Sequence, residues 1–393
     1  MIMKKIIFGM LLVMTGCSVR PSQTERIVYL DEKTGNEVWQ VSQGDSMSLM
    51  PYFETQGFTY DDRYAVFKSK REGDWKLFST SIATGEVCKI SDRVVDGSYS
   101  VYTTGDEVIF MERGIIYAVH VETHAERVLF DANGKIDEAV ISFNALFTND
   151  GAWMVLTGQN PDRSSSFYRL HVPSGRLEKV YSSKTGFTHP MINPVYPNLI
   201  TFVPKPDKRA MYDLPKEERA RGMLLNTDDG SVRPFVMSEK YYRATHETWS
   251  KDGERLYYFD KLHKSGYADP TMGWEISVVS IDKTGCDRTV HYLNNVYKLA
   301  HGIATEDQHF FVCDVDRPRN NPLYLINLTT GEAEIVCWAN QTQPSLGNVQ
   351  TEHVHPLFSR SGNYIAFTSD RNSPGVPQAF IVPIAKLKQK YER

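Results

Sequence analysis

The sequence predicts an all-β protein made of seven similar four-stranded units, and three repeating features indicate this. Turns that end in glycine follow apolar stretches at intervals of about fifty residues: Gly35, Gly85, Gly175, Gly230, Gly285 and Gly331. A second kind of turn, rich in Ser, Thr and Asp, precedes apolar stretches at 58–62, 147–151, 249–253 and 358–362. Four histidines also recur, with gaps of 57, 55 and 54 residues: His189, His246, His301 and His355.

Each unit therefore consists of a strand, a polar turn, a strand, a loop, a strand, a glycine turn and a last strand. Antiparallel four-stranded repeats of this length are typical of the blades of a β-propeller. One glycine turn is degenerate, near 122–124, within the double interval between Gly85 and Gly175. We expect seven blades, which begin near residues 50, 96, 142, 187, 244, 296 and 352.

The two ends of the chain predict how the ring closes. The last unit ends after a strand near 378–383 and lacks an outer strand, whereas segment 26–42 supplies a surplus strand and a glycine turn before the first complete unit. An N-terminal strand that completes the C-terminal blade would seal the ring without an exposed sheet edge.

The first residues are typical of a targeting segment. Lys4 and Lys5 precede a short apolar run at 6–14, and Met14-Thr15-Gly16-Cys17 resembles a lipobox. We interpret 1–17 as a lipoprotein signal peptide with Cys17 as the lipidation site, an ordinary cleaved signal peptide being the alternative. Residues 18–24 then form a tether and 25–393 a single propeller domain. We expect an exported protein, lipid-anchored at the periplasmic face of a bacterial membrane, inner or outer.

The composition limits the partners. Among 393 residues, 41% are hydrophobic and 12% aromatic, enough for a large core, and the net charge is −4. No global basic field would recruit nucleic acid, so an anionic ligand needs a local basic pocket. We expect the remaining cysteines to be buried apolar filler: Cys88, Cys286, Cys313 and Cys337.

One polar segment, 205–221, interrupts the fourth unit before its third strand. It is either a tolerated surface insertion or a basic wall beside a ligand, beginning at Lys205.

The repeated histidines predict a metal site. They fall at the start of the innermost strands of four consecutive blades, so their side chains should converge on the central channel. His353 and His355 lie two residues apart and share a face of a strand, with Gln350 just before them. Imidazoles with an amide oxygen and no thiolate favour an open site for Mn²⁺ or another divalent cation over a closed zinc site.

Each histidine also has a simpler interpretation, since a histidine on a strand is usually a hydrogen-bonded core residue. The clustering of Gln350, His353 and His355 favours metal binding, and His301 is expected to join them. His189 precedes a proline and can simply end a loop, and Arg243 is interpreted as structural. Substrate contact is the alternative for both, as it is for Lys205.

These residues resemble a known family. Gln350-x-x-His353-x-His355-Pro356, Thr245-His246-Glu247-x-Trp249 and His301 after an apolar strand are similar to the oligogalacturonate lyases, seven-bladed propellers of polysaccharide lyase family 22. The resemblance covers roughly 45–385. It implies a metal-dependent lyase that cleaves short oligogalacturonides, which are pectin fragments, to 4,5-unsaturated products.

The resemblance also implies roles for individual residues. His301, Gln350, His353 and His355 would bind Mn²⁺, His246 would be the Brønsted base, and Arg221 looks like the arginine that helps to bind the acidic sugar. The chain departs from the family pattern at 203–206 and 302–307. These departures leave another acidic, uronate-containing oligosaccharide open as the substrate.

The residues fit this chemistry independently. The C5 proton of a 4-linked uronide is α to a carboxylate and weakly acidic. A divalent cation and an arginine would stabilise the charge that develops when the proton leaves, and a neutral His246 would accept it. The rival is a non-catalytic binding module resembling TolB-type propellers, which needs no ring of histidines. The expected partner is an acidic oligosaccharide, and the oligomeric state stays open.

Overall fold

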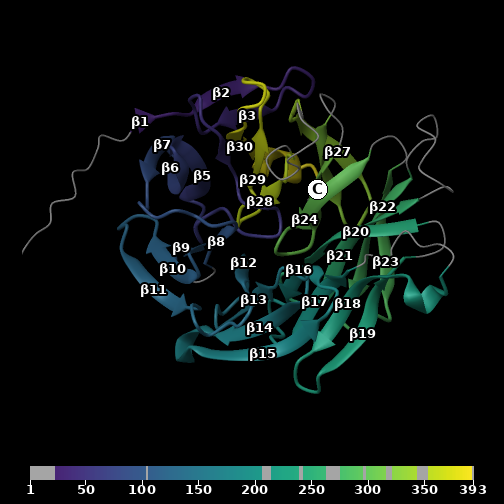
Figure 1. Ribbon diagram of the computed structural model, residues 1–393. Helices are drawn as coiled ribbons and strands as arrows, with labels where there is room; N and C mark the ends of the chain where they lie inside the picture. The colour runs from purple at the N-terminus through teal and green to yellow at the C-terminus, as the bar shows by residue number, and fades with distance from the viewer. Residues whose placement is uncertain are drawn as a thin grey trace, which may run out of the picture.

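The computed structural model describes residues 23–102, 105–205, 214–238, 242–262, 275–294, 298–315, 321–342 and 353–391. Within these ranges the strands form seven antiparallel sheets. The sheets are arranged as blades in a ring around a central axis (Figure 1), as the sequence repeats predict.

The innermost strand of each blade is its first in the chain, and the strands follow one another outward. Blade 1 consists of β4 (Ser48–Leu49), β5 (Tyr64–Glu72), β6 (Asp74–Ser81) and β7 (Glu86–Lys89). Blade 2 consists of β8 (Tyr99–Val101), β9 (Glu107–Glu112), β10 (Ile115–His120) and β11 (Glu126–Asp131). Blade 3 consists of β12 (Val140–Phe147), β13 (Trp153–Gln159), β14 (Ser165–His171) and β15 (Arg176–Ser183). Blade 4 consists of β16 (Phe187–Ile192), β17 (Leu199–Pro204), β18 (Ala220–Asn226) and β19 (Ser231–Met237). Blade 5 consists of β20 (Tyr242–Trp249), β21 (Arg255–Leu262), β22 (Ile276–Asp282) and β23 (Arg288–Asn294). Blade 6 consists of β24 (Leu299–Ala304), β25 (Phe310–Val315), β26 (Pro322–Asn327) and β27 (Ala333–Trp338).

The seventh blade is assembled from both ends of the chain. It contains β28 (Leu357–Phe358), β29 (Tyr364–Ser369) and β30 (Gln378–Pro383), followed outward by β3 (Glu37–Gln40) and β2 (Ile27–Leu30). Trp39 and Gln40 pair with Ile381 and Phe380, and Figure 1 shows the purple N-terminal strands beside the yellow C-terminal ones. Because β30 is paired on both sides, the last complete hairpin presents no open edge.

The first described strand alters one expected boundary. Gln23 and Thr24, which we placed in a tether, form β1 and pair with Val87 and Glu86 on the outer strand of blade 1. The folded part of the chain therefore begins before residue 25, because these two residues supply backbone groups to an otherwise open sheet edge.

The core lies between neighbouring blades. Seven clusters of buried apolar side chains occur in the described part of the chain, and each joins two successive blades. In the cluster between blades 3 and 4, for example, Phe167 and Phe202 are both fully buried. Burial of each such side chain contributes about 1.5–3 kcal/mol to the stability of the fold. The ring is therefore held together by packing between the blades.

Polar turns connect the first and second strands of the blades. In blade 3 the Thr148 hydroxyl donates to Asp150 at 2.6 Å and accepts from the backbone N–H of Trp153 at 3.0 Å. Ser250 makes the same bonds to Asp252 and Arg255 in blade 5. The repeated Ser/Thr-x-Asp pattern therefore encodes a hydrogen-bonded turn, which explains why it recurs.

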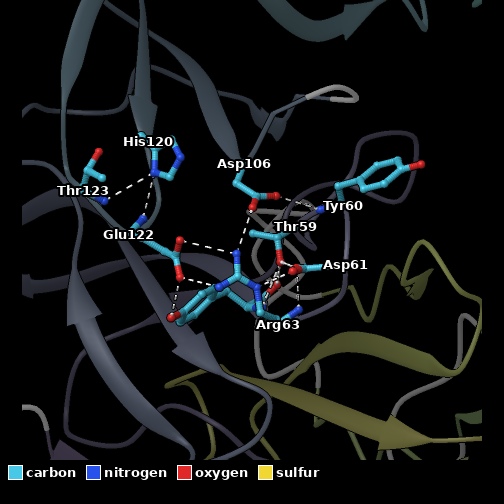
Figure 2. Close-up of polar contacts among 9 residues, drawn as sticks. Thr59, Tyr60, Asp61, Arg63, Asp106, His120, Glu122 and Thr123 are labelled. Atoms are coloured by element: carbon cyan, nitrogen blue, oxygen red, sulfur yellow. Dashed lines mark hydrogen bonds and ion pairs between the residues drawn. The ribbon is translucent and has the colours of Figure 1, made fainter.

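The turn of blade 1 also carries an ionic contact to blade 2. Arg63 pairs with Asp61 of its own turn and reaches across to Glu122 at 2.6 Å and Asp106 at 3.5 Å (Figure 2). The backbone N–H of Tyr60 donates to Asp106 at 3.0 Å. This group joins two blades on the surface, where exposed ion pairs contribute little to stability.

Three smaller features complete the fold. Helical segments are short: η1 (Val172–Ser174), η2 (Lys216–Glu218) and α2 (Ala385–Lys388). In the described ranges, none of the helices has the length and apolar character required to cross a membrane. The insertion lies between β17 and β18, but its expected last residues, Ala220 and Arg221, belong to β18, and 206–213 lie outside the described residues. Cys313 and Cys337 are buried, whereas Cys286 is exposed and Cys88 only partly buried, so the filler interpretation was wrong for Cys286.

Candidate metal centre and catalytic site

The repeated histidines lie at irregularities of the innermost strands. The pairing register shifts between Thr188 and Met191 in blade 4 and between Thr245 and Thr248 in blade 5. It also shifts after Leu299, in blade 6. Such bulges bend a strand and aim a side chain out of its regular alternation. His189, His246 and His301 therefore recur with a bulge inside the innermost strands of blades 4 to 6, and the expected place at the start of the strand was wrong for these three.

Three of these histidines have left-handed backbone angles. The φ angles are 51° at His189, 55° at His246 and 48° at His355, and Ala145 occupies the matching place in blade 3 with 57°. A non-glycine residue in this region costs about 1–3 kcal/mol and is found where a functional geometry requires it. Four of the ten described non-glycine residues with positive φ therefore belong to the innermost strands or the loop that leads into β28.

The histidines meet at that axis. The ring centre of His301 lies 4.3 Å from that of His355, 4.8 Å from that of His353 and 4.4 Å from that of His246. One nitrogen from each of His301, His353 and His355 can be chosen so that all three lie within 4.8 Å of one another. Imidazoles from blade 6 and from the loop before β28 thus form one cluster.

A buried carboxylate orients the cluster. Asp314 on β25, with 2% of its surface exposed, contacts Nδ1 of His301 at 3.0 and 3.2 Å. It also accepts the backbone N–H groups of His301 at 2.7 Å and His355 at 3.2 Å. Because a carboxylate only accepts hydrogen bonds, Nδ1 of His301 carries the proton and Nε2 is left as a donor atom for a metal.

The donor set fits a divalent cation. Nε2 of His355 is buried and has no hydrogen-bond partner among the described residues. Burial, followed by nearby His301 and His353, holds the pKa of His355 well below its ordinary value, so the imidazole is neutral. Neutral imidazoles are the form that binds transition metals. Gln350, the fourth expected ligand, lies outside the described residues.

His246 adjoins the cluster from blade 5. It is partly buried, and its Nδ1 has no hydrogen-bond partner in the described ranges. Burial lowers the pKa of His246 well below its ordinary value, with further lowering by His301, Lys261 and Arg221. A neutral imidazole next to the cluster can accept a proton.

Arg221 on β18 does not present a free guanidinium. Its side chain is 3% exposed and makes a bidentate pair with Glu247, with contacts of 2.6 and 3.2 Å. Although burial opposes it, the charge of Arg221 keeps the pKa of Glu247 below its ordinary value. Burial and the negative charge of Glu247 raise the pKa of nearby Glu54 to about 8, with Arg221 opposing. The guanidinium of Arg221 is therefore held by Glu247, and its positive charge influences the pKa values of His246, Glu247 and Glu54.

Two aromatic residues support the histidines from the loop after β4. The ring of Tyr52 lies 4.7 Å from that of His355, edge to face, and Phe53 lies 5.4 Å from His301. Burial, followed by Glu54 and Glu247, raises the pKa of Tyr52 well above its ordinary value. These rings fix the imidazoles by packing.

The cluster borders a cleft of about 380 Å³. His355 and His189 line it together with Tyr52, Glu54 and Asn144. A second cavity of about 130 Å³ follows the channel, and Glu54 lines both. Lys205, an exposed residue at the end of β17, and Arg243, partly buried on β20, line neither cavity.

Several site residues were missed by sequence reasoning: Tyr52, Phe53, Glu54 and Asp314. Asp314 left a readable signal, since it is the one acid in the otherwise apolar strand β25, and a buried acid requires a partner. The Tyr52-Phe53-Glu54 segment left none, because it is a loop without repeat equivalents. Glu247 was noted only as part of a motif.

Comparisons with known proteins give a consistent picture. No family model matches the chain. It is 21% identical to the oligogalacturonate lyase of Dickeya dadantii, over 91% of this chain and 95% of that protein, and equally similar to the oligogalacturonide lyase of Pectobacterium atrosepticum. A solved oligogalacturonate lyase in complex with manganese superposes with a TM-score of 0.77 at 19% identity, over 91% of this chain and 96% of that one. The oligogalacturonate lyase of Vibrio parahaemolyticus gives 0.76 at 19%, over 92% and 97%. The chain is therefore similar over nearly its full length to oligogalacturonate lyases, and it shares their fold.

Proposed function

We propose that this protein is a metal-dependent lyase that cleaves short oligogalacturonides by β-elimination, giving 4,5-unsaturated products. The observation that carries the proposal is the cluster of His301, His353 and His355, oriented by Asp314 and flanked by His246. The similarity to oligogalacturonate lyases along 91% of the chain supports the choice of substrate.

The cluster would hold Mn²⁺, the metal present in one of the similar structures. His301, His353 and His355 would be ligands, with Gln350 proposed as the fourth from its place in the sequence. When bound, a divalent cation would stabilise negative charge developing on the uronate carboxylate. Three neutral imidazoles bring no negative charge into direct contact with the cation, which favours an anionic substrate.

His246 is the proposed base that removes the C5 proton. Its imidazole is neutral and lies beside the proposed ligands. A uronate whose carboxylate is held by the cluster would therefore present its C5 proton near His246. General base catalysis of this kind contributes about 10²–10⁴-fold. The bond from C4 to its oxygen then breaks as the double bond between C4 and C5 forms, and the released oxygen takes up a proton from water to become the hydroxyl group of the second product.

Arg221 is proposed to assist this step by its positive charge. The pair with Glu247, the residue after His246, holds the guanidinium in place, and its charge helps to lower the pKa of His246. That position disfavours protonation of the base before the substrate arrives, and the same charge would stabilise the anion that forms afterwards. His189, which lines the cleft, is proposed as a substrate contact. The positions of Lys205 and Arg243 outside both cavities make them weaker candidates for this role.

The reaction has a direct assay. The purified protein is mixed with digalacturonate and Mn²⁺, and the ultraviolet absorbance of the conjugated product is followed. We expect a rise that chelator abolishes, that added Mn²⁺ restores, and that is absent in His246→Ala. No rise with digalacturonate or with any other uronic-acid oligosaccharide would overturn the proposal and favour a non-catalytic binding module. A rise only with another uronide would change the substrate and keep the reaction.

We further propose that the protein is exported and lipid-anchored at the periplasmic face of a bacterial membrane. Residues 1–17, a lipoprotein-type signal with Cys17 as the lipidated residue, and the start of the tether lie outside the described residues. The sequence Lys4-Lys5, the apolar run and Met14-Thr15-Gly16-Cys17 support the proposal. Labelling of expressing cells with a radioactive fatty acid should mark the wild type and not Cys17→Ser. Equal labelling of both would contradict it.

A further inference from the structure

The cleft beside the histidines continues to a wall that the proposed reaction does not use. That wall comes from blade 1 and from the loop leading into blade 2, and contains Lys68 on β5, Trp75 on β6, Gly97 and Ser98. His355 of blade 7 and His189 of blade 4 line the same cleft. Its volume of about 380 Å³ is within the range of about 300–1,000 Å³ for small-ligand pockets.

Among the described residues, Lys68 is a cation without an acidic partner. Its ammonium donates to the carbonyl oxygen of Gly97 at 2.8 Å, and no carboxylate among the described residues forms an ion pair with it. An ammonium has three protons, so two remain for other acceptors. Burial, followed by neighbouring Lys70, lowers the pKa of Lys68 to about 8. A partly buried ammonium in this condition gains from an anionic ligand, which would offset its lost hydration.

Trp75 supplies an aromatic surface beside that ammonium. Lys68 and Lys70 each place their ammonium group 5.1 Å from the ring centre of Trp75. Both lysines lie on the same face of β5, because they are two residues apart on one strand. They differ in one respect: Lys68 lines the cleft, whereas Lys70 is exposed and does not. An indole can pack against the apolar C–H face of a sugar ring while the ammonium contacts its carboxylate.

We propose that Lys68 and Trp75 form a second uronate subsite, which holds the carboxylate and ring of the sugar next to the one that reacts at the histidine cluster. The inference rests on the proposed function, since it takes the reacting uronate to be the one at His301, His353 and His355. Lys68 and Trp75, both in blade 1, would then explain why the protein prefers acidic oligosaccharides to single sugars. An occupied subsite would contribute binding energy equally to the ground state and the transition state.

Removal of the charge alone tests the subsite. Lys68→Met keeps the length and apolar stem of the side chain, and Lys70→Met is a matched control on the same strand and beside the same ring. For digalacturonate, we expect Lys68→Met to raise KM about tenfold with kcat within twofold of the wild type. Lys70→Met should change KM less than twofold. Thermal denaturation of both variants checks that the blade is intact.

A second measurement separates the subsite from catalysis. Binding of digalacturonate is measured by calorimetry in the His246→Ala background, with and without Lys68→Met, and is repeated with digalacturonate whose carboxylates are amidated. We expect Lys68→Met to weaken binding of the acidic dimer about tenfold and to leave binding of the amidated dimer unchanged. An equal effect on both ligands would overturn the charge contact.

The outcomes distinguish the two proposals. If the wild type cleaves digalacturonate and Lys68→Met has an unchanged KM, the subsite is refuted and the lyase function remains. If the wild type cleaves no uronide but still binds the dimer in a manner that depends on Lys68, the function is refuted and an acidic-sugar site remains. Absence of both cleavage and binding refutes both.

Discussion

Replacement of Asp314 by Asn should lower the affinity of the metal site without removing a ligand. The two carboxylate oxygens accept the N–H of His301, the N–H of His355 and Nδ1 of His301. An amide has one accepting oxygen, and its NH₂ group must face one of the two backbone N–H groups. In either orientation a buried donor loses its acceptor, and the orientation of His301 is no longer fixed.

The magnitude follows from these contacts. Removal of the partner that orients a ligating histidine typically costs 10–100-fold in metal affinity, about 1.4–2.8 kcal/mol. One unsatisfied buried N–H costs a further ~1–3 kcal/mol of folding stability. We therefore expect Asp314→Asn to bind Mn²⁺ 10–100-fold more weakly in competition with a chelator. Much of the kcat should return at saturating Mn²⁺, because His246 and the three imidazoles remain.

A second buried aspartate provides the control. Asp260 is also 2% exposed and pairs with Arg288 at 2.8 Å, but it lies on β21 of blade 5, whereas the proposed ligands His301, His353 and His355 come from blade 6 and the loop before β28. Asp260→Asn should lower stability and leave the affinity for Mn²⁺ unchanged. Wild-type metal affinity in Asp314→Asn, or an equal loss in Asp260→Asn, would refute the reasoning.

Further predictions concern the base, the strained backbone and pH. His246→Ala should abolish turnover while bound metal persists, whereas His353→Ala should lose both turnover and metal. Metal analysis and the absorbance assay check these outcomes. Full activity in His246→Ala would exclude His246 as the base. His246→Gly should be about 1 kcal/mol more stable than His246→Ala in denaturant unfolding, because glycine adopts φ = 55° without strain; equal stabilities would contradict the strain. Although burial opposes it, hydrogen bonds from Ser166, Tyr168 and Lys179 lower the pKa of Glu138 to about 2. Ionised Glu138 therefore contributes ~3 kcal/mol to the free energy of unfolding above pH 4.5, and this contribution is lost as the pH falls towards 2. Glu138→Gln should remove this part of the acid dependence, and an unaltered pH profile of unfolding would count against it.

The sequence by itself determined the architecture. Turn chemistry and strand alternation are local properties, so repeats of Ser/Thr-x-Asp turns and glycine turns specify blades wherever they occur. The repeats gave the number of blades and the approximate start of each, and the unpaired first and last strands indicated that the ends of the chain meet. The spacing of His189, His246 and His301 likewise reflects one local feature, a bulge that recurs in blades 4 to 6.

Only the tertiary structure decided what those side chains meet. His246, His301 and His355 come from blades about fifty residues apart, and their distances depend on closure of the whole ring. The partner of Asp314 depends on the pairing of β25 with β24, and the burial of Arg221 against Glu247 depends on the packing of blade 4 on blade 5. Interactions between residues distant in the chain carry no periodic signal in a single sequence. The site is therefore specified by packing at the axis, where strands from all the blades converge.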